Sequence, residues 1–155
     1  MISGVFGLSA TAYARLLTGP INGMPESTSY TWGDGIHDLT TQWSVLHAAT
    51  GRGWFYGSDY PWGLDFYVAK GLKDPTTISN AAGFTYNKGS GIAEEGDTVF
   101  FRGANAYYGA WRIDDIYPPD SPPTYLNGQW YFQSDGTGNF RRPAAAPFIY
   151  LLLLK

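Results

Sequence analysis

Residues 97–113 read Asp97-Thr-Val-Phe-Phe-Arg-Gly-Ala-Asn-Ala-Tyr-Tyr-Gly-Ala-Trp-Arg-Ile113, and this stretch predicts a β-hairpin. One arm covers residues 97–102 and is rich in the β-branched and aromatic side chains that favour strands. The small residues 103–106 supply the turn. The returning arm covers residues 107–113, within a hairpin assigned to residues 97–117. The acidic run at residues 94–97, which leads into the first arm, is typical of a solvated turn that enters a strand.

The segments that follow extend the β pattern. Residues 118–123 read Pro-Pro-Asp-Ser-Pro-Pro, and the prolines deny amide donors to any strand ladder, which favours an extended surface loop or a rigid contact arm. Residues 124–133 read Thr-Tyr-Leu-Asn-Gly-Gln-Trp-Tyr-Phe-Gln. The pair Asn127-Gly128 suits the positive φ angles of a type I′ turn, and apolar residues flank it on both sides. A second hairpin is therefore predicted over residues 124–133.

The first half of the chain is less regular. Residues 9–17 suit a short helix, with Ser9 as its N-cap and Gly19-Pro20 as its stop signal. Residues 36–50 fit either a helical face or a strand face, and we favour the strand. The runs 54–56 and 64–69 read as further strands.

Composition points to the same fold class. The 155 residues are 17% aromatic and include 20 Gly, 10 Pro and no Cys, so the chain is large enough for a core that needs no disulfides. Seven to nine short strands separated by turn residues indicate antiparallel pairing. We predict a single all-β domain over residues 1–155: an antiparallel β-sandwich, jelly roll or barrel with long aromatic- and Pro/Gly-rich loops and at most one or two short helices.

Charge and hydropathy disfavour several partners. The net charge of −3 and the pI near 5.1 disfavour nucleic acid, which attracts basic surfaces. Residues 148–154, Phe-Ile-Tyr-Leu-Leu-Leu-Leu, are strongly apolar but far shorter than the roughly 20 residues of a membrane span. We read them as a buried strand. The N-terminal residues lack the basic region of a Sec signal peptide, so none is expected.

No pattern of catalytic or metal-binding residues stands out. The chain has no Gly-x-Ser-x-Gly motif, and its two histidines, His37 and His47, lie ten residues apart with no third ligand nearby. On a strand, adjacent acids such as Asp114-Asp115 point to opposite faces, which does not suit a hydrolase pair. Residues 134–139 alternate oxygen ligands but lack the glutamate that closes an EF-hand loop. We expect no enzyme activity, no cofactor and no metal.

The aromatic residues are the main candidates for recognition. Trp and Tyr rings stack on sugars when they are exposed, and Trp62, between Pro61 and Gly63, best suits a loop tip. The same residue types also build β-sheet cores and subunit interfaces. The candidate ligand or interface residues are Asp59, Tyr60, Trp62, Tyr107, Tyr108, Trp111, Pro118, Pro119, Pro122 and Pro123.

These features favour a non-enzymatic structural or assembly protein. The proline arm and the apolar segments near both ends, residues 1–20 and 148–154, suit contacts with neighbouring subunits. A virion component, such as a capsid decoration (cement) or tail protein at the virion surface, would combine these properties. It would form a homo-oligomer or dock on a larger protein assembly. The alternative is a lectin-like module that binds a glycan through exposed Trp and Tyr.

Overall fold

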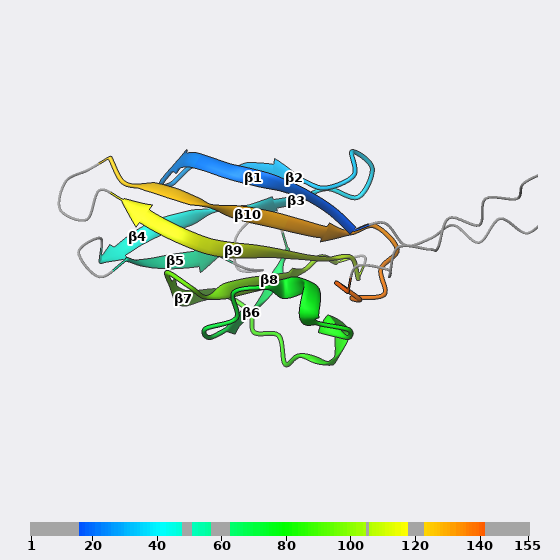
Figure 1. Ribbon diagram of the computed structural model, residues 1–155. Helices are drawn as coiled ribbons and strands as arrows, with labels where there is room; N and C mark the ends of the chain where they lie inside the picture. The colour runs from blue at the N-terminus through cyan, green and yellow to red at the C-terminus, as the bar shows by residue number, and fades with distance from the viewer. Residues whose placement is uncertain (1–15, 48–50, 57–62, 105, 118–122, 142–155) are drawn as a thin grey trace, which may run out of the picture.

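The computed structural model describes residues 16–47, 51–56, 63–104, 106–117 and 123–141 (Figure 1). The described part is nearly all β, and its helical residues form two short 3₁₀ turns, η2 (Pro75–Thr77) and η3 (Ala81–Gly83). The strands are β1 (Leu16–Pro25), β2 (Tyr30–Trp32), β3 (Leu39–Thr41), β4 (Trp43–His47), β5 (Arg52–Tyr56), β6 (Asp65–Ala69), β7 (Ser90–Glu94), β8 (Thr98–Arg102), β9 (Tyr108–Tyr117) and β10 (Tyr125–Gln133).

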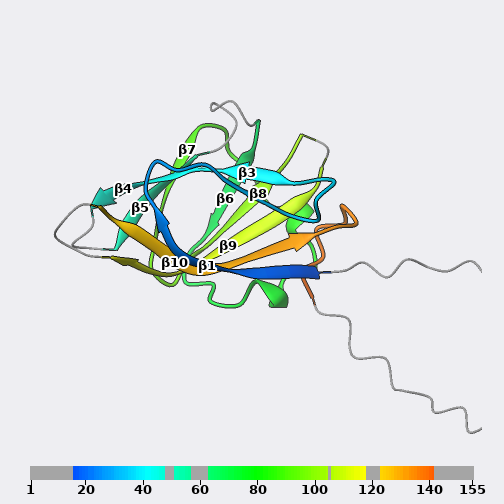
Figure 2. The same ribbon diagram turned by 90° about the horizontal axis from the view of Figure 1, so that it is seen from above.

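The strands form three antiparallel sheets. The largest has the order β1-β10-β9-β8-β6, and the two smaller sheets are β4-β5-β7 and β2-β3. Seen from above, β3 and β4 lie across from β1 and β10, so the small sheets form a second layer over the large one (Figure 2). The predicted all-β class is confirmed, and the arrangement is that of a β-sandwich.

Both faces of the large sheet are covered. In β8, Val99 and Phe101 point into the main core beneath the small sheets, whereas Phe100 points to the opposite face. That second face packs against the irregular segment that contains η2 and η3, for example through Ala81 and Phe84. Because β8 is covered on both sides, residues 98–101 are all buried. This explains why the run is almost entirely apolar rather than alternating with polar residues.

The hairpin predicted over residues 97–117 is confirmed. Strands β8 and β9 pair antiparallel, and Arg102 lies opposite Tyr108. The N–H of Gly103 donates to the carbonyl of Tyr107 across the turn. The strand interpretation of residues 36–50 is confirmed over β3 and β4, and the predicted strands at 54–56 and 64–69 appear as β5 and β6.

The hairpin predicted over residues 124–133 is wrong. These residues form one continuous strand, β10, with a β-bulge between Asn127 and Gly128 where it pairs with β9. Gly128 does not take a positive φ. The Asn127 side chain instead accepts a hydrogen bond from the N–H of Gly23 on β1, 2.8 Å away. Pairing with β1 on one side and β9 on the other overrides the local turn preference, because a central strand satisfies far more backbone groups than an isolated turn.

The helix predicted over residues 9–17 is wrong where it can be compared. Leu16 and Leu17 belong to β1, and the expected stop signal Gly19-Pro20 lies inside that strand. A side chain at Gly19 would collide with the Trp130 ring on the neighbouring strand, so glycine permits a close approach here. Proline is tolerated because β1 is an edge strand, where a missing N–H can face away from the sheet. Residues 9–15 lie outside the described residues.

The acidic turn before β8 is not solvated throughout. Asp97 is 3% exposed, and its carboxylate accepts hydrogen bonds from the Lys70 ammonium at 2.7 Å and from the N–H groups of Gly71 and Glu94, both at 2.9 Å. It thereby ties the end of β6 to the corner between β7 and β8. Within the described residues, no helix has the length and apolar character needed to cross a bilayer. The apolar segment 148–154 lies outside them, as does most of segment 1–20.

Candidate functional site

The structure places four of the ten candidate residues. Trp111 and Tyr108 are buried, Tyr107 is partly buried, and Pro123 is exposed just before β10. Pro123 lies at the opposite end of β9 and β10 from Tyr107, so the structure does not bring these two together. Asp59, Tyr60, Trp62, Pro118, Pro119 and Pro122 lie outside the described residues.

Trp111 belongs to the core. It is fully buried, and the rings of Trp32 and Phe101 lie 5.9 and 5.6 Å from its own, measured between centroids. The Phe55 ring packs edge-on against it at 6.2 Å. Trp111 therefore presents no ring face to a sugar, and the same holds for the buried Tyr108.

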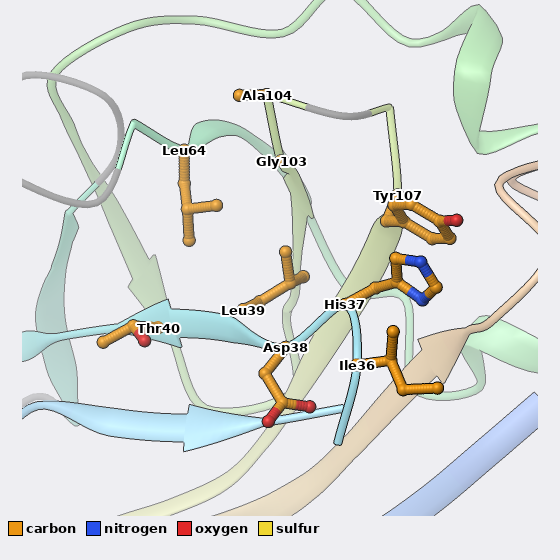
Figure 3. Close-up of a pocket in the computed structure, with 9 residues that line it drawn as sticks. All are labelled: Ile36, His37, Asp38, Leu39, Thr40, Leu64, Gly103, Ala104 and Tyr107. Carbon is orange, nitrogen blue, oxygen red and sulfur yellow. The ribbon is translucent and has the colours of Figure 1, made fainter. Parts of the chain in front are cut away.

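A cavity of about 260 Å³ opens at the end of the sandwich that carries Tyr107 (Figure 3). It lies between the β2–β3 turn, residues 33–38, and the β8–β9 turn, residues 103–107. The side chains of Leu39 and Leu64 point into it, and both are buried. We call this cavity, with Ile36 at its rim, the end pocket.

Hydrogen bonds to two aspartates fix the 33–38 turn. The Asp34 carboxylate accepts from the N–H groups of Ile36 and His37, at 2.8 and 2.7 Å. The Asp38 carboxylate accepts from the N–H of Gly35 at 2.7 Å. Aspartate side chains stabilise turns in this way by pairing with backbone donors a few residues away. The turn is thus held in one conformation that leaves Ile36 82% exposed.

His37 joins this turn to the core. Its Nδ1 lies 3.0 Å from an Asp34 carboxylate oxygen, and its ring stacks on Tyr107 with 4.1 Å between centroids (Figure 3). Tyr107 in turn packs against the buried Phe132 at 6.1 Å. A carboxylate–imidazole pair can orient a catalytic base, but it needs a nucleophile within reach. The contact with Asp34 and the stacking on Tyr107 hold the His37 ring between the turn and the core, so the pair positions the turn.

The electrostatics of Asp34 follow from this geometry. Partial burial acts to raise the pKa of its carboxyl group. The hydrogen bonds from the His37 ring and from the backbone N–H groups of His37 and Ile36 favour the charged form and outweigh burial. The pKa of Asp34 therefore lies below its ordinary value, and the ionised carboxylate holds the turn.

This shift predicts how acid affects the turn. Because the pKa of Asp34 is lower in the folded than in the unfolded state, its stabilising contribution is present above the unfolded pKa, about 3.9, and is lost as the pH falls through the folded value. We expect a small, acid-dependent loss of stability that Asp34→Asn removes. Urea unfolding of both proteins between pH 7 and pH 2 checks this. Parallel pH profiles for the two proteins would contradict the assignment.

A second cavity, of about 500 Å³, lies near the corner between β7 and β8. Three of its four charged side chains are already engaged, and the fourth is Lys73. Arg112 makes two hydrogen bonds of 2.6 Å to the Asp114 carboxylate, and Glu95 accepts from the N–H of Ile116. Saturated groups of this kind suit a structural role rather than ligand capture. In the described part of the chain, no three His, Asp or Glu side chains cluster closely enough to hold a metal ion.

Sequence reasoning missed Ile36, which lines the end pocket, and Asp34, whose carboxylate holds the turn that carries Ile36. A signal was present: Gly33-Asp34-Gly35 followed by Asp38, between two apolar runs, is typical of a turn braced by carboxylates. No known protein family, curated protein or solved structure matches this chain.

Proposed function

We propose that this chain is a non-enzymatic assembly module that docks on copies of itself through the end pocket. The observation that carries the proposal is the exposure of Ile36, which is 82% exposed on a turn fixed by carboxylate hydrogen bonds. Single exposed apolar residues are common on protein surfaces. This one differs because it sits on a preorganised turn, directly beside a cavity whose floor is formed by Leu39 and Leu64, and rigid presentation lowers the entropic cost of binding.

The rest of the described structure agrees with a docking role. Ile36 and Tyr117 are the two exposed large hydrophobic side chains among the described residues, and Ile36 is the one that lines the end pocket. A capsid decoration (cement) or tail protein of a virion is the setting we propose, because small β-rich modules serve there as docking units. This setting rests on analogy between folds.

The carbohydrate-binding alternative has less support. Of its candidate aromatic rings, Trp111 and Tyr108 are buried, and Tyr107 is already stacked against His37. The alternative therefore depends on Asp59, Tyr60 and Trp62, which lie outside the described residues.

Replacing Ile36 with serine tests the docking proposal. We expect the wild-type chain to form a discrete oligomer and Ile36→Ser to shift it to monomer, measured by light scattering over a hundredfold range of concentration. Thermal stability should hardly change, since Ile36 is mostly exposed.

Tyr117→Ser is the matched control, because Tyr117 is the other exposed apolar side chain, 37% exposed, and lies at the far end of β9. It should leave the oligomer intact. A variant at position 36 that assembles as well as the wild type would refute docking through this face.

A further inference from the structure

We infer that the end pocket receives residues 148–155, Phe-Ile-Tyr-Leu-Leu-Leu-Leu-Lys, from a second copy of the chain. This inference rests on the proposed function, because it names the partner at the same site. Three observations support it: the chemistry of the pocket floor, the charge of its rim, and the place where the described chain ends.

The floor and size of the pocket suit aliphatic side chains. Leu39 and Leu64 form its base and are 4% and 3% exposed, and Ile36 extends the apolar surface at the rim. Its volume of about 260 Å³ lies below the range of about 300–1,000 Å³ typical of pockets for drug-sized ligands. An aliphatic side chain or two, inserted from a peptide segment, fits such a cavity better than a large cofactor does.

One carboxylate, that of Asp38, belongs to the residues that line the pocket. Asp38 is exposed beside the cavity, and neither lysine nor arginine occurs among the described residues that line it. Lys155, directly after four leucines, is the single charged side chain of segment 148–155. An aliphatic side chain in the pocket would therefore bring a cation toward the Asp38 carboxylate, and such complementarity favours one register of docking.

The described chain ends close to the pocket but on the other face of the large sheet. The loop after β10 lies at the same end of the sandwich, where a Cβ added at Gly136 would lie 3.5 Å from the carbonyl oxygen of Ala106 in the 103–107 turn. Arg141, however, donates to the carbonyl of Thr77 in η2, which covers the face opposite the end pocket. The six residues 142–147 span at most about 22 Å when fully extended. Because the proposed function is docking between copies, we assign the segment that fills the pocket to a neighbouring copy.

The test uses full-length variants and the association constant measured by light scattering. Leu152→Ser combined with Leu154→Ser should weaken association about tenfold or more, the effect of withdrawing aliphatic groups from the leucine floor of the pocket. Ala144→Ser combined with Ala146→Ser is the matched control. It adds the same two hydroxyls to the spacer and should leave the association constant unchanged.

A double-mutant cycle then tests the register. Asp38→Asn removes the charge but keeps the oxygen that accepts from Gly35, and Lys155→Gln removes the partner charge. Each should weaken association roughly two- to fivefold, as expected for an exposed ion pair, and the double variant should be no weaker than either single one. Fully additive effects would overturn the pairing of Lys155 with Asp38.

The outcomes separate this inference from the proposed function. If Ile36→Ser abolishes the oligomer but the Leu152/Leu154 variant does not weaken it, docking through the end pocket stands and segment 148–155 is not the occupant. If the wild-type chain is monomeric at every concentration, both proposals are overturned.

Discussion

Trp111→Ala is expected to destabilise the fold by about 4 kcal/mol, the usual cost of truncating a large buried aromatic side chain. Trp111 is fully buried, and the rings of Tyr30, Trp32, Phe55 and Phe101 pack around it from both layers of the sandwich. Domains of this size are stable by about 5–15 kcal/mol, so much of the total would be lost. Urea unfolding followed by far-UV circular dichroism measures the effect.

Trp111→Phe is the informative control. The indole Nε1 of Trp111 is buried and has no hydrogen-bond partner in the described structure, so phenylalanine gives up no bond and keeps much of the ring packing. We expect less than half the loss seen with alanine. If Trp111→Ala unfolded at the wild-type urea concentration, Trp111 would not be the centre of the core.

Gly128→Ala is expected to cost about 3 kcal/mol, because the added methyl group would overlap the backbone carbonyl oxygen of Arg112 on β9. A backbone atom in a paired strand cannot move aside without breaking the register of β9 against β10. The bulge between Asn127 and Gly128 is therefore a place where only glycine fits. Chemical denaturation of the purified variant gives the free energy of unfolding directly.

Gly71→Ala supplies the comparison for this prediction. Gly71 has a φ of +67°, and an added Cβ there meets open space, so alanine costs only the backbone strain of about 1 kcal/mol. If residues 127–128 formed a type I′ turn, Gly128→Ala would also show only this strain. Equal losses at the two positions would favour the turn, whereas a clearly larger loss at position 128 supports the bulge.

Much of the fold could be predicted because its signals are local. The hairpin of β8 and β9 combines two strand-forming arms with a turn of small residues, and each part agrees with the others. The strands at 39–47, 52–56 and 65–69 likewise follow from their own side chains. The errors at residues 9–17 and 127–128 have the opposite cause. There a local signal for a helix or a turn competes with long-range strand pairing, and pairing prevails because it satisfies the backbone over many residues.

The candidate site was less accessible to prediction. Tyr107 was named from the sequence and does line the end pocket, but its partners His37 and Leu64 lie far from it in the chain. Trp111 and Tyr107 pack against the same core, and their exposure differs because Trp111 lies within β9 whereas Tyr107 lies just before that strand, at the end of the sandwich. Asp97 shows the same limit, since a turn acid typical of the surface becomes a buried link once Lys70 and Gly71 are folded against it.

The sequence by itself determined that this protein is an all-β domain built from short aromatic strands, since strand propensity and turn preference depend on each residue and its near neighbours in the chain. Only the tertiary structure decided which strands pair, which rings are buried and where an apolar side chain is left exposed. Those outcomes depend on contacts between residues distant in the chain. The end pocket is the clearest case. The β2–β3 turn, the β8–β9 turn and Leu64 just before β6 meet there, and no local sequence pattern connects these three segments.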